Sequence, residues 1–452
     1  MNKNIVFMFI VLSICPSCNL SKILFVFEMF RHGTRSSLFN MTNLPDGKFI
    51  DNFHIKWDNK GGLTNLGYRM LYTLGVHNKL KYKDFIASLK IPQDIYVLST
   101  TVTRAYESAQ SFLMGLFPHI EHNDLISEST LPKSFPPNNI TDSILKELSL
   151  LNSKTLPYGI PSIPINFISE KEIYTILSYE KYCPNISSLK STLRKSDRIN
   201  NFLSKVNNTY GKQILHYFNL TTTPSALFNY TTMFNMFENF VTCFENNKNL
   251  TSLVNEGINL ELFNQFGIEM RTNYLRYVES NEETSPFAVS ITIPKIIEWM
   301  DNIVYQKNIS SMPKYVIYSG HDSTLSPFEL YFQKVFDVEW EYPNFGANLY
   351  LEIEYDEKDE EYYVRYLFND KVKFVKKFEE FRKDVLKGLW SKQEINKFCG
   401  LNTNINMKYA GIIIVSFLVV IGIIFIYIYK KNIKKNKKKN EEENKGEELV
   451  NK

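Results

Sequence analysis

Outside its C-terminal tail, the 452-residue chain has no excess of either charge. Residues 430–452 carry nine Lys and five Glu and account for the formal net charge of +4. Apart from Lys3 near the N-terminus, the residues before this tail hold 42 basic and 43 acidic side chains. A domain that binds nucleic acids is typically basic. The near-neutral balance therefore argues against nucleic acid as a partner.

Cysteine is also scarce, with five in the chain. Cys15 and Cys18 lie in the N-terminal leader and are expected to be removed with it. Cys183, Cys243 and Cys399 remain. In an oxidising compartment, the simplest arrangement of three cysteines is one disulfide and one remaining thiol.

The sequence has no internal repeat and no complete set of metal ligands. His119 and His122 form an H-x-x-H pair, but no third ligand is spaced to match it, so we interpret the pair as part of an exposed loop. The pair therefore gives no indication of a metal site. Apolar residues make up 44% of the chain and aromatic residues 14%, which is enough to fill the core of more than one domain.

Residues 1–18 have the pattern of a secretory signal peptide. Lys3 supplies the positive flank, and residues 5–15 form the apolar region, which small residues follow. The alternative is a membrane anchor, but an apolar run of eleven residues is too short to span a bilayer. The sequence leaves the cleavage position open between Ser17 and Ser21.

A second apolar run, residues 409–429, contains 21 residues without a charge and is long enough to span a bilayer as a helix. Seven lysines follow directly, at positions 430, 431, 434, 435, 437, 438 and 439. Because positive charge is retained in the cytosol, we predict a single transmembrane helix, a cytoplasmic tail at 430–452 and a short stalk at 400–408. The alternative, a buried helix of a soluble domain, suits neither the length nor the flanks.

This topology places the residues between the leader and the transmembrane helix in a lumen or outside the cell. Eight N-glycosylation sequons fall between residue 40 and the membrane span and none in the tail; they begin at Asn40, Asn139, Asn185, Asn207, Asn219, Asn229, Asn249 and Asn308. Their segregation is consistent with a single-pass type I membrane glycoprotein. The sequence does not distinguish a lysosome-like vesicle from the cell surface, and it leaves open whether the protein forms a homodimer.

Three short runs, at 23–28, 95–98 and 315–318, have the composition of strands that are buried on both faces. Polar or charged residues follow each run at once. Ligands of open parallel sheets bind at the carboxyl ends of the strands, so the pattern predicts one site built from three distant segments. Helix-like stretches at 63–80 and 103–116 lie between the runs. We therefore expect an α/β fold with a mainly parallel sheet flanked by helices.

The expected α/β core is built from two pieces, residues 19–118 and 285–399. The stretch between them, 119–284, is rich in Asn, Ser, Thr and Pro and contains scattered amphipathic segments, which predicts an inserted, mostly helical cap domain. Alternating segments at 348–355 and 362–374, joined by an acidic loop, predict a late antiparallel hairpin.

The first strand-like run leads into the sequence RHGTRSS, in which Arg31 and Arg35 flank His32. Arginine forks bind phosphate oxygens in bidentate fashion, and a histidine between two of them can meet the phosphorus atom. Gly33 lets the backbone turn tightly where a ligand approaches. The alternative is an exposed basic turn, but the position directly after a buried strand favours a phosphate site.

The other two runs supply further candidate residues. SGHDST after the third run contributes His321 and Asp322, and STTVTRAYESAQ after the second contributes Arg104. Considered alone, a His-Asp pair arises readily by chance, and Arg104 has the features of an ordinary surface charge on a helix. Their positions after the strands favour one shared cavity.

Together these motifs resemble the histidine acid phosphatase family of the phosphoglycerate-mutase-like superfamily. The family's RHGxRxP and HD motifs and its ST...R...SA segment are matched by Arg31, His32, Gly33, Arg35, His321, Asp322, Ser99, Thr100, Arg104, Ser108 and Ala109. The resemblance extends over residues 23–385. The membrane anchor and short tail are similar to those of the lysosomal branch of the family.

The resemblance implies a phosphatase that hydrolyses small-molecule phosphate monoesters without a metal or cofactor. It implies that His32 attacks phosphorus to form a phosphohistidine and that Asp322 donates a proton to the leaving group. The phosphate oxygens would be held by Arg31, Arg35, Arg104 and His321. The resemblance also implies a disulfide between Cys183, in the sequence KYCPN, and Cys399.

Two positions depart from the family pattern. Ser37 stands where the family usually has Pro, and Thr101 stands where it usually has Asp. Neither position is expected to touch phosphorus, so the departures concern the rigidity of the turn and the hydrogen bonds near Arg104.

Two alternatives to an acid phosphatase remain. A phytase or inositol polyphosphate phosphatase would need a markedly basic pocket rim, which the near-neutral domain does not favour. A non-catalytic surface glycoprotein with the same fold would be marked by loss of His32, Asp322 or an arginine, and all of these are present.

Overall fold

The structure, a computed structural model, describes most of the chain between residues 21 and 434. The described ranges are 21–38, 42–43, 49–50, 53, 55–118, 129, 136, 141–149, 163–167, 183–220, 228–279, 281–306, 312–400 and 416–434. The predicted signal peptide, the stalk after Gly400, the H-x-x-H pair and the tail beyond Lys434 lie outside these residues, as do the sequons at Asn40, Asn139 and Asn308.

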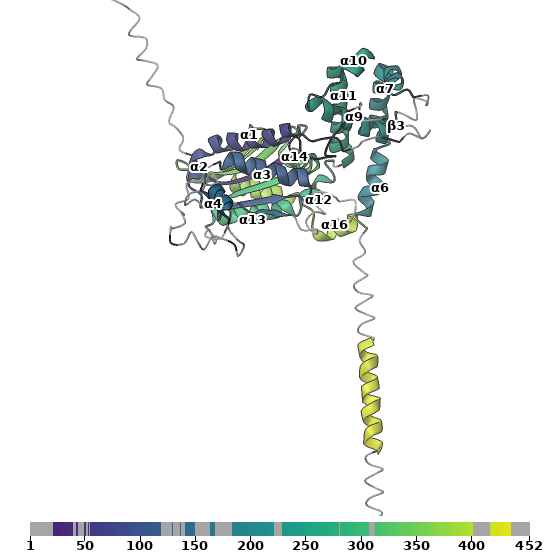
Figure 1. The fold of residues 1–452 in the computed structure, drawn as a ribbon. Helices are drawn as coiled ribbons and strands as arrows, with labels where there is room; N and C mark the ends of the chain where they lie inside the picture. Colours follow the sequence, from purple (N-terminus) through teal and green to yellow (C-terminus); the bar gives the residue numbers. More distant parts are fainter. Residues whose placement is uncertain are drawn as a thin grey trace, which may run out of the picture. The chain divides into compact units, whose positions relative to one another are not determined.

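A seven-stranded sheet forms the centre of the first of two compact units, Met1–Ser391 (Figure 1). Its strand order is β5-β4-β6-β1-β7-β8-β9. The strands are β1 (Ser21–Arg31), β4 (Ile95–Ser99), β5 (Ile165–Phe167), β6 (Tyr315–Gly320), β7 (Asn348–Asp356), β8 (Glu361–Phe368) and β9 (Lys371–Lys377). A separate two-stranded sheet pairs β2 (Thr42–Asn43) with β3 (Phe49–Ile50).

The sheet is mixed, so the prediction of a mainly parallel sheet was wrong in this respect. Strands β5, β4, β6 and β1 are parallel, whereas β7, β8 and β9 continue from β1 in antiparallel pairs. The antiparallel half arises because the chain after residue 348 returns through short turns instead of crossover helices, which parallel pairing requires. The parallel half supplies the strand ends at which the predicted motifs begin.

The predicted late hairpin is correct in place but contains one strand more than expected. Residues 362–374 are divided between β8 and β9 by a tight turn at Asn369 and Asp370, whose φ angles are +46° and +61°. Positive φ at both central residues is typical of the type I′ turn that joins two antiparallel strands, and Asn and Asp tolerate it better than most residues. The Asn-Asp pair was therefore a turn signal inside the alternating pattern.

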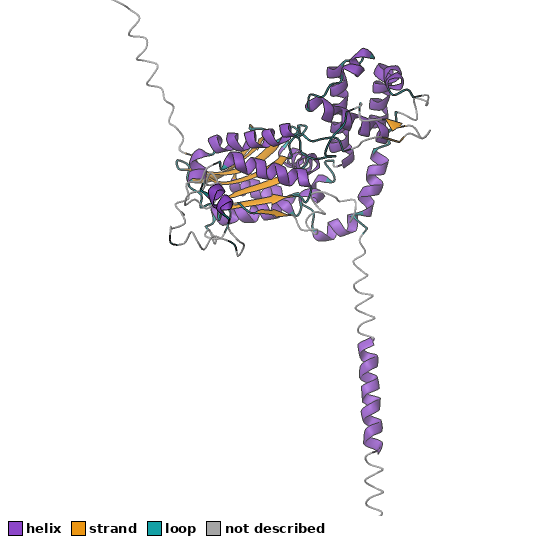
Figure 2. Cartoon of the chain, in the orientation of Figure 1, coloured by secondary structure: helices purple, strands orange, loops and turns teal. Residues whose placement is uncertain are grey.

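Helices cover both faces of the sheet (Figure 2), and the alternation of β1 explains why. Phe25, Phe27 and Met29 lie in one hydrophobic cluster, and Val26 and Phe30 lie in the cluster on the opposite face. The first cluster includes residues of α13 (Thr292–Val304), α14 (Asp322–Phe336) and α15 (Phe378–Lys387), with α12 (Ser285–Val289) beside them. The second cluster includes residues of α1 (Asn65–Lys81), α2 (Lys83–Ala87) and α3 (Thr103–Leu116).

A group of helices with its own hydrophobic cluster comes from within residues 119–284, the stretch predicted as a cap. It contains α6 (Pro184–Leu193), α7 (Asp197–Tyr217), α9 (Tyr230–Glu245), α10 (Thr251–Asn255), α11 (Leu260–Asn273) and the π-helix η4 (Tyr274–Glu279), with α4 (Asp142–Leu148) earlier in the chain. Residues of α7, α9, α10 and α11 pack into one cluster (Figure 1). The same stretch also holds β5, which pairs with β4 and so extends the core sheet.

The second compact unit, Lys392–Lys452, contains α16 (Lys392–Phe398) and a helix at Ser416–Lys434. By length and composition this helix is able to cross a membrane, and it overlaps the predicted span 409–429. Among the cysteines, Cys183 and Cys399 are disulfide-bonded. Cys243 keeps a buried thiol, and burial raises its pKa to about 12.

Candidate active site

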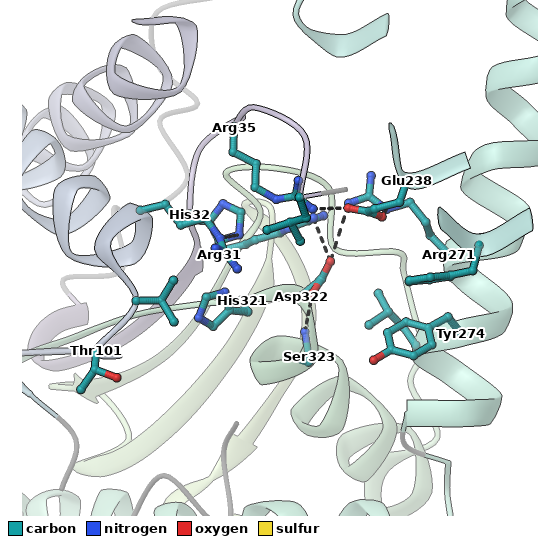
Figure 3. A pocket seen from close by; sticks show the side chains of 15 residues that line it. Arg31, His32, Arg35, Thr101, Glu238, Arg271, Tyr274, His321, Asp322 and Ser323 are labelled. Carbon is teal, nitrogen blue, oxygen red and sulfur yellow. Dashed lines mark hydrogen bonds and ion pairs between the residues drawn. The ribbon is translucent and has the colours of Figure 1, made fainter. Parts of the chain in front are cut away.

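The carboxyl ends of three neighbouring parallel strands bring the predicted site residues together. Arg31, His32 and Arg35 follow β1, Arg104 follows β4, and His321 and Asp322 follow β6; all six line one cavity of about 410 Å³ (Figure 3). β6 lies between β4 and β1 in the sheet, so three segments distant in the sequence meet at one edge. The sequence-based prediction of a single composite site therefore agrees with the arrangement of the strands.

His32 is buried, with 2% of its surface exposed, and its ring is held in one tautomer. Nδ1 lies 2.8 Å from the carbonyl oxygen of Gly33, which can only accept, so Nδ1 carries the proton. Nε2 lies 2.9 Å from Nε of Arg104, which can only donate, so Nε2 carries the lone pair. The basic nitrogen of His32 therefore points toward the cationic centre of the cavity.

The loop that carries His32 packs closely against the start of α1. A Cβ atom on Gly33 would lie 2.4 Å from the carbonyl oxygen of Gly67, and a Cβ on Gly67 would lie 2.1 Å from the carbonyl oxygen of Thr34. Neither position has room for a side chain. The amide of Gly33 also donates to Oγ of Ser108 on α3 (3.1 Å), so the loop is fixed against both helices.

Two arginines of the first motif are buried and tied to opposite sides of the cavity. Nη2 of Arg31 lies 2.8 Å from Oδ2 of Asp322, and Nη1 donates to the carbonyl oxygen of Pro343 (2.8 Å). Arg35 donates from Nη2 to Oε1 of Glu238 on α9. The Arg31 guanidinium is thus held by acceptors outside the motif, whereas the Arg35 guanidinium is held by Glu238 and by the carbonyl oxygen of Ser36 within the motif (3.0 Å).

The arginines shape the charge of the two histidines. Burial, together with Arg104 and the other nearby cations, lowers the pKa of His32 well below its ordinary value. Burial and Arg104 likewise lower the pKa of His321 to about 3. Both imidazoles are therefore neutral over the pH range of most biological compartments, and His32 is able to act as a nucleophile.

His321 marks the junction of β6 and α14. Its backbone amide donates to Oγ1 of Thr324 (3.0 Å), which caps the first turn of the helix, and its Nε2 lies 3.0 Å from Oγ1 of Thr100. The ring centres of His321 and His32 are 5.2 Å apart. The N-terminus of α14 therefore faces the cavity, where the helix dipole favours an anion.

Asp322 is the first residue of α14 and is partly exposed to the cavity. Its Oδ1 accepts a hydrogen bond from the amide of Ser323 (2.8 Å). Burial alone would raise the pKa of Asp322, but Arg31 and Arg271 outweigh burial and lower the pKa to about 2. The carboxyl group is therefore ionised in the unliganded cavity.

Two charged residues of the cavity, Glu238 on α9 and Arg271 on α11, were not predicted from the sequence. Oε2 of Glu238 lies 3.1 Å from Nε of Arg271, and Nη2 of Arg271 lies 3.8 Å from Oδ2 of Asp322. Both belong to helices from the stretch 119–284, where no motif points to a site. A signal was nevertheless present, because Arg271 is the one basic residue of α11 and falls on its buried face.

The cavity offers several hydrogen-bond donors without an acceptor. Among the described residues, Nε of Arg31, Nε of Arg35 and Nη2 of Arg271 are buried and have no hydrogen-bond partner. A buried polar group left in this state costs roughly 1–3 kcal/mol, and a charged group costs more. A bound oxyanion would offset the positive charge of the guanidinium groups that carry these nitrogens.

The two residues that depart from the family pattern, Ser37 and Thr101, lie in different parts of the site. Ser37 is buried and donates from Oγ to Oδ1 of Asn239 on α9, which ties the motif loop to that helix. Thr101 lines the cavity beside Val102 and Arg104. Ser37 thus bears on how the loop is held, as expected, whereas Thr101 also forms part of the cavity wall.

Comparison with known proteins gives relatives of low to moderate identity. The chain is 35% identical to testicular acid phosphatase of Mus musculus over 97 residues, which are 21% of this chain and 22% of that protein. It is 23% identical to prostatic acid phosphatase of Homo sapiens over 312 residues, which are 68% of each chain. The first match thus spans about a fifth of its relative and the second about two thirds.

A solved structure shares the fold. The phytase of Klebsiella sp. ASR1 superposes with a TM-score of 0.51 and 14% identity, covering 82% of this chain and 96% of the phytase. At this identity the likeness concerns the fold alone. The sequence profile of the histidine phosphatase superfamily (branch 2) matches residues 22–369, which include six of the seven strands of the sheet, β1 to β8, and all six motif residues of the cavity. The chain therefore belongs to branch 2 of the histidine phosphatase superfamily.

Proposed function

We propose that the protein is an acid phosphatase that hydrolyses phosphate monoesters through a phosphohistidine at His32. The observation that carries the proposal is the orientation of the His32 ring, whose Nδ1 is bound to the Gly33 carbonyl and whose Nε2 lone pair faces Arg104. A nucleophile for a phosphoryl group needs an unprotonated nitrogen next to cations that bind the phosphate oxygens. The cavity meets both needs.

In the first half-reaction, Nε2 of His32 forms a bond to phosphorus as the bond from phosphorus to the ester oxygen breaks. Charge accumulates on the phosphate oxygens, which Arg31, Arg35, Arg104 and His321 hold. Arg104 exchanges its contact with Nε2 for a contact with a phosphate oxygen, because the nitrogen lone pair is needed for the attack. The Nδ1–H group stays hydrogen-bonded to the Gly33 carbonyl, whose oxygen offsets the positive charge that develops on the ring.

Asp322 donates a proton to the departing ester oxygen. It is ionised in the unliganded cavity, where its pKa is about 2. A bound phosphate places negative charge beside Arg31 and Arg271, and this raises the pKa of Asp322. A phosphate monoester near or below its second pKa of about 6 also brings a proton with it. We therefore expect Asp322 to be protonated in the substrate complex and activity to be highest in acid.

In the second half-reaction, a water molecule attacks phosphorus and the bond from phosphorus to Nε2 breaks. The Asp322 carboxylate, which has given up its proton, accepts one from the attacking water. Inorganic phosphate leaves, and His32 returns to its neutral state.

The proposal includes a location. The signal peptide at 1–18, the sequons and the lysines after residue 429 favour a single-pass type I membrane glycoprotein whose catalytic domain is lumenal or extracellular. The helix Ser416–Lys434 suits the anchor by length and composition. A pairing of Cys183 with Cys399 belongs to the same proposal, since an oxidising compartment is needed for a lasting disulfide.

The test is a steady-state assay of the full-length protein, solubilised in detergent, with p-nitrophenyl phosphate at pH 5. We expect hydrolysis by the wild-type protein and its loss in His32→Ala, because the nucleophile is removed. His216→Ala serves as the matched control, since His216 is an exposed histidine on α7. Equal rates for wild type and His32→Ala would disprove the proposal, and no activity in any variant would favour a non-catalytic glycoprotein.

A further inference from the structure

Glu238 is a buried carboxylate in the wall of the phosphate cavity. It is 5% exposed and lies between two arginines, with Oε1 paired to Arg35 and Oε2 at 3.1 Å from Nε of Arg271. Burial alone would raise the pKa of Glu238, but Arg271 and Arg35 outweigh it and lower the pKa. Glu238 is therefore a fixed negative charge beside the site where phosphate is proposed to bind.

Arg271 is held in place by its neighbours. It is 3% exposed, and its guanidinium lies 5.1 Å from the ring centre of Phe345 and 5.7 Å from that of Tyr342. The charge of Glu238 raises the pKa of Arg271 against the effect of burial, so the group stays cationic. The two residues thus form a buried ion pair that α9 and α11 add to the six motif residues.

The charges of the cavity balance against a single phosphate. Its described lining contains four guanidinium groups, those of Arg31, Arg35, Arg104 and Arg271, and two carboxylates, those of Asp322 and Glu238. With both histidines neutral, the net charge is two positive. A phosphate group carries about −1.5 to −2 near neutral pH, so a single group matches the net charge of the unliganded cavity.

The rest of the described lining carries no formal charge. It comprises Leu38, Thr101, Val102, Phe234, Tyr274, Leu275 and Ser323. Phe234 and Tyr274 pack together with ring centres 4.7 Å apart, and the Tyr274 hydroxyl donates to Glu279 (2.6 Å), which fixes its direction. Figure 3 places Tyr274 on the same side of the cavity as Glu238 and Arg271. The leaving group of an ester would therefore meet apolar and aromatic surface instead of further cations.

We propose that Glu238, held by Arg271, is a specificity-determining residue that restricts the site to esters with a single phosphate. This inference rests on the proposed phosphatase function. A second phosphate on the substrate would face the carboxylate of Glu238 and the uncharged wall, and like charges brought together without a counterion disfavour binding. The preferred substrates are then monophosphates, and polyphosphorylated esters are rejected.

The experiment compares two substrates that differ by one phosphate, fructose 6-phosphate and fructose 1,6-bisphosphate, with the full-length protein in detergent. The readout is the ratio of kcat/KM for the monophosphate to kcat/KM for the bisphosphate. We expect a ratio well above one in the wild type and a fall of roughly tenfold or more in Glu238→Gln, which removes the charge and keeps the shape. Glu238→Asp keeps the charge and should keep the preference for the monophosphate.

Glu261→Gln is the matched control, because it removes one exposed carboxylate from α11 outside the cavity, and its ratio should equal that of the wild type. An unchanged ratio in a folded, active Glu238→Gln variant would overturn the inference. So would equal wild-type kcat/KM values for both substrates, a result that decides the matter even if Glu238→Gln does not fold. Failure of the phosphatase proposal is distinguishable, because the wild type would then hydrolyse neither substrate, or His32→Ala would hydrolyse fructose 6-phosphate as fast as the wild type.

Discussion

At the scale of single residues, the proposed proton donor Asp322 depends on the same cations that are proposed to bind phosphate. Arg31 and Arg271 keep its carboxyl ionised in the unliganded cavity, with a pKa of about 2. The proposed role as proton donor therefore depends on the charge of the bound phosphate, which shields the carboxyl from the two arginines. If Asp322 is the proton donor, a variant that lacks this proton should be impaired most with substrates whose leaving group needs protonation.

We predict that Asp322→Asn slows the hydrolysis of glycerol phosphate by roughly 10²-fold or more and that of p-nitrophenyl phosphate much less. An alkoxide is a poor leaving group and needs the proton, whereas nitrophenolate departs with little help. Steady-state kcat/KM values for the two substrates, measured on the same preparation, test this. The same factor for both, while hydrolysis of the phosphohistidine is not rate-limiting, would make Asp322 a residue that orients phosphate.

At the scale of elements, the motif loop depends on how α1 begins and how closely α1 packs. Gly67 in the first turn of α1 touches the backbone of Thr34, and Gly75, two turns later, touches the backbone of Phe112 on α3. Both contacts leave no space for a Cβ, but only the first involves the segment that carries His32. Substitutions at the two glycines therefore distinguish a change in the position of His32 from a general loss of helix packing.

We predict that Gly67→Ala lowers kcat/KM for p-nitrophenyl phosphate at least about tenfold, because the loop must move away and takes His32 with it. Gly75→Ala, whose Cβ would lie 2.1 Å from the carbonyl oxygen of Phe112, is the matched control. Both should lower the free energy of unfolding, each by about 1–3 kcal/mol. Equal activity losses in the two folded variants would contradict a specific link between α1 and the catalytic loop.

The helices and strands also differ in how far they, and the site residues they carry, could be predicted from the sequence. Motifs directly after buried strands were predictable, because parallel strand ends meet at one edge. The Asn369-Asp370 turn was missed because the alternation of the flanking strands continues across it. Glu238 and Arg271 were missed for a different reason, since helices from the stretch 119–284 bring them to the cavity through tertiary packing. The spacing of residues along the sequence does not predict that these two side chains reach the cavity.

At the scale of the whole molecule, the proposed topology predicts glycans on the domain before the membrane helix. Asn185, Asn219 and Asn249 begin sequons and are exposed in the described structure. We expect enzymatic removal of N-linked glycans to increase the electrophoretic mobility of the full-length protein from a glycosylating host. Unchanged mobility would contradict a lumenal or extracellular orientation.

Two buried carboxyls outside the cavity link the stability of the fold to pH. Burial raises the pKa of Glu28, in β1, to about 7 and the pKa of Glu329, in α14, to about 8. Glu28 accepts hydrogen bonds from Asn78 (2.8 Å) and Tyr315 (2.7 Å), which only partly offset its burial. A carboxyl with a raised pKa binds its proton more tightly in the folded state, so stability rises as pH falls through that pKa.

The neutral histidines of the cavity act in the opposite direction. An unfolded chain protonates His32 and His321 below about pH 6.5, whereas the folded chain does not, so this contribution lowers stability as the pH falls further. At pH 6.5 this opposition is about 0.4 kcal/mol for each histidine, and the two carboxyls together contribute more than that between pH 8 and 6.5. We therefore expect the fold to gain stability on acidification across that window.

We predict that the melting temperature of the wild type is higher at pH 6.5 than at pH 8 and that Glu28→Gln reduces the difference. The contribution of Glu28 to this window is about 1 kcal/mol from a folded pKa of about 7. Thermal unfolding followed by circular dichroism at the two pH values measures it. Exposed Glu261→Gln is the control and should keep the wild-type difference, whereas an undiminished pH difference in Glu28→Gln would contradict the assignment.

The central claim, that His32 carries the phosphoryl group, is tested most directly by trapping the intermediate. The full-length protein is mixed at pH 5 with phenyl phosphate that carries the radiolabel on phosphorus. The reaction is quenched with alkali within milliseconds, and the protein is digested for peptide mapping. We predict an alkali-stable, acid-labile label on the peptide that contains His32, and its absence in His32→Ala. A label on another residue, or undiminished turnover by His32→Ala, would contradict the account.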